Sequence, residues 1–119
     1  VVINSWMGLE ESGGANFNPA TGEYTIPVDG YYAISSQVSF SGTASSTSVA
    51  EIAIRKNGTA AKYGISPIIT GSKFPSLHVS MEMKLVAGDK IALAIDHIYG
   101  SSLTMQANLS GFSIHLIHK

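Results

Sequence analysis

Apolar and polar residues alternate along much of this chain with a period of two. The clearest case is the segment 31–40, in which one face is apolar and the other carries mainly small polar residues. The residues of the first face are Tyr32, Ile34, Ser36, Val38 and Phe40. Because successive side chains of a strand point to opposite faces, this alternation predicts one long, half-buried strand.

Shorter alternating segments predict further strands at 52–55, 79–85, 91–95 and 112–116. The first of these ends before Asn57-Gly58, a dipeptide that tolerates the positive φ angles of a tight hairpin turn. Other residues typical of turns stand at 18–22, 27–30, 88–89 and 99–101. No segment has the apolar spacing of a helix. The sequence therefore predicts a single all-β domain, a sandwich or barrel with jelly rolls among the alternatives.

Composition and charge narrow the classes of function. The chain has 119 residues, a length typical of one domain. Charged residues make up 13% of it, against about 25% in an average globular protein, while 45% of its residues are apolar, which excludes a disordered chain. Seven basic and eight acidic residues are scattered without runs, so neither nucleic acid nor an anionic membrane is expected as a partner.

The absence of cysteine excludes disulfide bonds and thiolate metal sites. The longest stretch without charge, 30–50, is rich in serine, so no membrane span is expected. The chain begins with valine and shows no basic and then apolar leader, which predicts a processed product or one module of a longer protein.

Four landmarks occur in an order that resembles the globular domain of C1q. The first is the segment from Phe17 to Tyr32, with Asn-Pro-Ala-Thr-Gly near its start and Gly-Tyr-Tyr at its end. The other three are Ile-Arg-Lys-Asn-Gly at 54–58, Leu-Val-Ala-Gly-Asp-Lys-Ile at 85–91 and Leu-Ser-Gly-Phe-Ser-Ile at 109–114. The resemblance extends from Phe17 to Ile117, and four motifs in this order are more specific than any single turn.

This resemblance implies an all-β, ten-stranded antiparallel jelly-roll sandwich of the C1q and tumour-necrosis-factor type, assembled as a homotrimer. It also implies a non-catalytic recognition head, outside the cell or on a particle surface, that binds a glycan or protein ligand through loops. The alternative is a structural knob that holds a collagen-like or coiled-coil stalk in register without a ligand of its own. The absence of cysteine and of Gly-X-Y triplets favours a bacterial or phage member of the family.

An alanine-rich strand face gives an independent reason to expect self-assembly. If the isoleucines of the segment 91–95 point into the core, Ala92 and Ala94 point outward, and Ala53 does so between Ile52 and Ile54. Small apolar side chains let a neighbouring subunit approach closely. A half-exposed alanine face on a monomer is the alternative. The residues predicted for the trimer interface are Trp6, Ala53, Ala92, Ala94, Asp96 and His115.

Catalysis and metal binding have weak support in the sequence. The chain lacks Gly-x-Ser-x-Gly, and neighbouring residues such as Asp96 and His97 would point to opposite faces of a strand, so no enzyme is expected. No organic cofactor is expected.

Whether the chain binds a metal ion is left open by the sequence. His115 and Asp96 could cluster on a threefold axis, and Asp29, Asp89 and Asp96 could bind calcium. Asp29 and Asp89 are expected instead to serve their turns.

Two stretches are predicted to be ligand-binding loops: the small polar segment 42–48 and the apolar segment 63–76. Tyr63, Phe74 and Tyr99 offer flat aromatic faces on which a sugar ring could stack. A place in the core or at a subunit interface is the alternative for each. The acceptor pattern for N-glycosylation occurs at Asn57 and Asn108.

Overall fold

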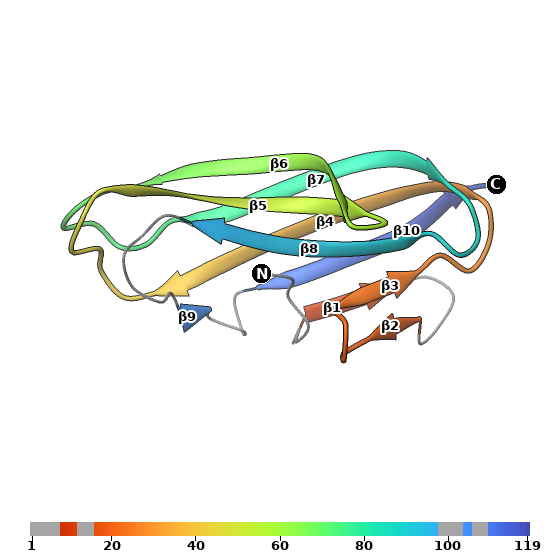
Figure 1. Cartoon of the computed structure of the whole chain (residues 1–119), viewed down its shortest axis with the longest axis horizontal. Helices are drawn as coiled ribbons and strands as arrows, with labels where there is room; N and C mark the ends of the chain where they lie inside the picture. Colours follow the sequence, from red (N-terminus) through yellow and green to blue (C-terminus); the bar gives the residue numbers. More distant parts are fainter. Residues whose placement is uncertain (1–7, 12–15, 98–103, 106–109) are drawn as a thin grey trace.

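The computed structural model describes residues 8–11, 16–97, 104–105 and 110–119 (Figure 1). Within these ranges every regular element is a β-strand and no helix occurs, which confirms the predicted all-β class. The strands are β1 (Gly8–Glu11), β2 (Phe17–Asn18), β3 (Glu23–Thr25), β4 (Gly30–Ser41), β5 (Ser48–Lys56), β6 (Thr59–Ile68), β7 (Ser76–Leu85), β8 (Lys90–His97), β9 (Thr104–Met105) and β10 (Gly111–His118).

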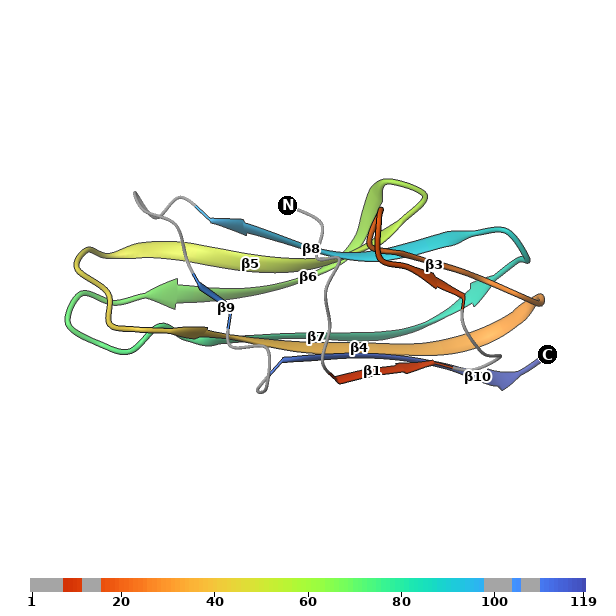
Figure 2. The same ribbon diagram turned by 90° about the horizontal axis from the view of Figure 1, so that it is seen from below.

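The strands form two sheets that face each other, as Figure 2 shows. One sheet has the order β1-β10-β4-β7, with β9 paired to the end of β4, and the other has the order β2-β3-β8-β5-β6. The strand pairs are antiparallel except for β1 and β10, which run parallel. The antiparallel sandwich is therefore confirmed in outline, but one pair at its edge departs from the predicted pattern.

The core lies between the two sheets and follows the alternation of the sequence. The apolar face of β4 is buried, and so are the facing positions of β5 and β8. Tyr32 is fully buried and its hydroxyl donates to the carbonyl oxygen of Val28 at 2.7 Å, so its polar end is satisfied. Each large apolar side chain buried in this way contributes about 1.5–3 kcal/mol relative to exposure. The core thus fixes which face of every strand is left for solvent or ligands.

Strand β6 corrects the prediction that residues 63–76 form one loop. Strand pairing with β5 continues to Ile68, so the connection between β6 and β7 is shorter and spans residues 69–75. Gly64 and Pro67 obscured the strand, because both residue types are depleted in sheets. β6 is an edge strand, where proline is tolerated. A side chain at Gly64 would clash with the carbonyl oxygen of His78, because β6 approaches β7 closely there.

The two ends of the sandwich differ in their connections (Figure 1). One end, called here the loop end, holds the segments 42–47 and 69–75, which connect β4 to β5 and β6 to β7. The other, called here the turn end, consists of the segments 26–29, 57–58 and 86–89, and the C-terminus lies on this side of the molecule. The Asn57-Gly58 hairpin turn is confirmed by the pairing of β5 with β6 and by φ angles of 51° and 84°.

Candidate functional site

The two connections of the loop end lie side by side and are joined by their main chains. The N–H of Ala44 donates to the carbonyl oxygen of Ser72 at 2.8 Å, and the N–H of Gly71 donates to that of Ala44 at 2.8 Å. A third bond runs from the N–H of Phe74 to the carbonyl oxygen of Gly42 at 3.2 Å. The structure therefore brings together the two stretches in which the sequence predicted ligand-binding loops.

A groove of about 360 Å³, called here the loop-end groove, lies where the end of β4 and the start of β7 meet these connections. Phe74 is half-buried in it and packs against the core. Gly42 has a φ of +102°, and a Cβ there would lie 3.4 Å from the Phe74 ring, so glycine suits both the backbone and the fit. Its lining residues are Ser39, Phe40, Ser41, Gly42, Thr43, Lys73, Phe74 and Ser76. This lining combines two phenylalanines with four residues that carry hydroxyl groups and one lysine.

A second groove, of about 450 Å³, lies where β6 passes β7 and is called here the flank groove. Tyr63 lines it and is 54% exposed, but it stands on β6 and not on a loop. The other lining residues are Ser35, Ser36, Gln37, Lys62, His78, Val79 and Ser80. The two grooves share no lining residue. The structure therefore places Tyr63 and Phe74, both predicted to contact ligand, in separate sites, and Tyr99 lies outside the described residues.

Sequence reasoning missed the polar side chains that gather around Tyr63. Gln37 and Ser35 belong to the polar face that the alternation of residues 31–40 had already indicated. The register of β4 and β7 sets Gln37 opposite His78 and Ser35 opposite Ser80. What the sequence did not show was that β6 continues to Ile68 and comes close to β7, so that residues of β6 line a groove together with residues of β4 and β7.

The alanines predicted for a trimer interface are already buried within one chain. Ala53, Ala92 and Ala94 are 6%, 4% and 3% exposed, respectively. They are absent from the core cluster, and Ala53 is paired with Ala94, so they lie on the outer face of the sheet. Their burial means that they offer little area of their own to a neighbouring subunit. Their role in an interface stays a prediction.

The other residues predicted for the interface lie apart. Asp96 is exposed at the end of β8, whereas His115 is exposed on β10 of the opposite sheet. His115 lines a further groove of about 290 Å³, together with Glu82 and Ser113 among others. Trp6 lies outside the described residues. One flat contact could not contain both Asp96 and His115, because they belong to different faces of the sandwich.

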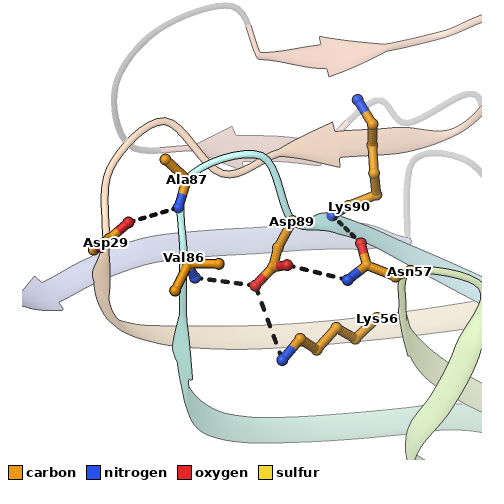
Figure 3. A network of polar contacts seen from close by, with 7 residues as sticks. All are labelled: Asp29, Lys56, Asn57, Val86, Ala87, Asp89 and Lys90. Carbon is orange, nitrogen blue, oxygen red and sulfur yellow. Dashed lines mark hydrogen bonds and ion pairs between the residues drawn. The ribbon is translucent and has the colours of Figure 1, made fainter.

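Asp89 sits at the centre of a polar network at the turn end (Figure 3). It is 8% exposed, and its carboxylate accepts hydrogen bonds from the Val86 N–H and from the Asn57 Nδ2, each at 3.0 Å. These two bonds lower the pKa of Asp89 below its ordinary value, the Val86 bond most strongly. Burial acts in the opposite direction, and the Lys56 ammonium at 3.9 Å adds a weaker lowering. The prediction that Asp89 serves its own turn is confirmed.

The network extends to the neighbouring turns. The Asn57 Oδ1 accepts the N–H of Lys90 at 2.8 Å, so both ends of the Asn57 amide are engaged. The Asp29 Oδ1 accepts the N–H of Ala87 at 2.8 Å, and Asp29 thus bonds across to another turn and not within its own. Within the described ranges, no three His, Asp or Glu side chains are grouped so as to hold a metal ion. Asn108, the other predicted glycosylation site, lies outside the described residues.

Comparison with known proteins does not assign the chain to a family. No protein-family model matches the chain, and no curated protein matches it. The resemblance to C1q therefore depends on the four sequence landmarks alone. Among the residues that the structure describes, no helix is long and apolar enough to span a membrane.

Proposed function

We propose that this chain is the non-catalytic recognition head of a longer protein, outside the cell or on a particle surface, and that it binds a glycan or protein ligand at its loop end. The proposed fold is a C1q-like jelly roll. Its support, beyond the sequence landmarks, is the path of the chain between the two sheets. The chain crosses from one sheet to the other and back in β3, β4 and β5, and again in β6, β7 and β8. Such alternation is expected of Greek-key sandwiches, to which jelly rolls belong.

The observation that carries this proposal is the pairing of the two connections around the loop-end groove. Main-chain hydrogen bonds fix the loops, and the side chains between them can vary without disturbing the core. Among its lining residues, Phe74 supplies an aromatic ring, while Lys73 and Thr43 supply hydrogen-bond donors. An apolar surface with a few polar groups around it suits a sugar ring or a short peptide.

The proposed assembly is a homotrimer. A closed ring joins two different surfaces of each copy, because its contacts are heterologous. The predicted contact residues Asp96 and His115 lie on opposite faces of the sandwich, as such a ring would require. Three copies of the loop-end groove would raise the overall affinity for a repetitive ligand. Light scattering at micromolar concentration should give three times the mass of one chain, and a stable monomer would contradict this part of the proposal.

Binding is tested on the assembled protein with arrays of glycans and proteins. The double variant Lys73→Ala, Thr43→Ala should lose most of the signal for any ligand held at the loop end. Lys84→Ala is the matched control, because Lys84 is exposed on β7 and lines neither described groove. Repeating the assay with a chelator tests the open question of calcium. A blank array, or binding equal in both variants, would contradict recognition at the loop end.

A structural knob is the second proposal, and one observation favours it. The hydroxyl groups of Ser39 and Ser76 bond to each other at 2.8 Å. These two polar groups of the loop-end groove therefore have a hydrogen-bond partner without a ligand. A knob that only holds a stalk in register could be replaced by an unrelated trimer-forming domain. Retained function of the whole protein after this exchange would support the knob, and loss of function would support the recognition head.

A further inference from the structure

The flank groove differs from its surroundings in charge and in hydrogen bonding. Its lining residues include Lys62 and no Asp or Glu. The side chains of Lys62, Gln37 and His78 make no hydrogen bond or ion pair with any other part of the described chain. The groove beside it, which shares Ser35 and Ser80, contains Glu82. The flank groove is therefore a place where donors are unused and no acidic group competes for them.

Tyr63 gives this groove a flat apolar wall. More than half of its surface is exposed, although an aromatic side chain gains most from burial. The close approach of Gly64 to β7 fixes the backbone next to Tyr63. The ring is thus carried by a strand in a fixed register with β5, and it needs no loop to order before it can stack.

We propose that the flank groove is a second binding site, for a sugar residue that carries a carboxylate. The Tyr63 ring stacks on the apolar face of the sugar, and the Lys62 ammonium pairs with its carboxylate. The amide of Gln37 and the hydroxyl groups of Ser35 and Ser80 bond to the sugar hydroxyls, for which they can both donate and accept. This site goes beyond recognition at the loop end and does not depend on it.

The carboxylate is the specific part of the proposal. A neutral sugar would leave the Lys62 charge without a partner as the groove loses water, whereas a uronic acid supplies one. An acidic lining residue would repel that carboxylate, and the flank groove has none. We therefore expect preference for an acidic sugar over its neutral form, not affinity for sugars in general.

The test is a titration of the intact protein, followed by NMR, with two matched probes. One is a trimer of galacturonic acid, and the other is the same trimer with its carboxylates methyl-esterified. The acidic probe should bind more tightly and should shift the signals of β6 and β7. Tyr63→Ala should weaken its binding about tenfold, whereas Tyr63→Phe should retain it, because the ring face remains. Lys62→Gln should abolish the preference between the probes, and Lys62→Arg should keep it.

Ile65→Ala is the control, because Ile65 is 66% exposed on the same strand and does not line the groove. Its affinity for the acidic probe should equal that of the parent chain. Equal affinity of the parent for both probes, or no shift at β6 and β7, would overturn the proposal. A change of molecular mass in Tyr63→Ala would also overturn it, because Tyr63 would then belong to a contact between copies. None of these outcomes tests the loop end, whose variants leave Lys62 and Tyr63 unchanged.

Discussion

The two ends of the sandwich are fixed in different ways. At the turn end, side chains reinforce main-chain bonds such as the one from the Ile26 N–H to the carbonyl oxygen of Asp89: Asp89 and Asn57 bond to each other and to the main chain of neighbouring turns. At the loop end, the hydrogen bonds between the two connections run mainly from main chain to main chain. Ala44, for example, donates to Ser72 and accepts from Gly71. A hydrogen bond made by a side chain is lost when that residue is replaced by another type. A hydrogen bond between main chains can form with almost any residue type at its two positions. Apart from Gly42 and Gly71, whose positive φ angles favour glycine, the loop end can therefore change its side chains more freely than the turn end.

Removing Asp89 should give the largest loss of stability. Asp89→Ala leaves the Val86 N–H and the Asn57 amide without their acceptor in a largely buried place. We expect a loss of about 2–4 kcal/mol, since bonds to a charged group are the stronger kind. Urea unfolding followed by circular dichroism, at one fixed protein concentration, measures it. Asp29→Ala removes a single exposed bond and should cost about 1 kcal/mol or less. Equal losses in both variants would contradict the central role of Asp89.

Asn57→Gly should have the next largest effect. Glycine accepts the positive φ of this turn, so the substitution removes the two side-chain bonds without straining the backbone. The expected loss is about 1–3 kcal/mol in the same unfolding experiment. Asn57→Ala should cost more, because it adds unfavourable backbone geometry to the lost bonds. A glycine variant as stable as the parent would show that the turn alone, and not the amide, holds this end.

Acid should weaken the turn end selectively, and by less than Asp89→Ala. The pKa of Asp89 is lowered in the folded chain, so its contribution is complete above the ordinary pKa and declines as the pH falls toward the folded value. A protonated carboxyl can still accept one bond, which makes the loss partial. Asp89→Asn cannot titrate, so the difference in unfolding free energy between parent and variant isolates the effect. This difference should shrink below about pH 4. A constant difference would contradict the lowered pKa.

The sequence was most informative where structure is local. The alternation of residues 31–40 predicted β4, because a period of two depends only on neighbouring residues. Asn57-Gly58 predicted its turn for the same reason. The extent of β6 was missed, since Gly64 and Pro67 are unfavourable in a strand considered alone and acceptable only at this edge. The parallel pairing of β1 with β10 joins the two ends of the described chain, and no local pattern encodes it.

The candidate sites show the same limit more strongly. Phe74 and Tyr63 were predicted as aromatic contacts from residue type, but only the fold shows that they line different grooves. Asn57 and Asp89 are 32 residues apart in sequence, and the pairing of β5 with β8 is what brings them into contact. The outward direction of Ala92 was predicted from alternation, whereas its burial depends on neighbours that the pattern does not name.

The smallest effect is expected at the loop end, at an exposed pair of threonine hydroxyl groups that joins its two connections. Thr47 and Thr70 bond through their hydroxyl groups at 2.8 Å, and both are exposed to water. Thr47→Val keeps the shape of the side chain and should cost about 0.5 kcal/mol or less, because water replaces the lost bond. The amide of Thr70, which also donates to Thr47, should exchange its hydrogen faster in the variant. A loss as large as that of Asn57→Gly would mean that side chains lock both ends, and that the loop end is no freer to vary than the turn end.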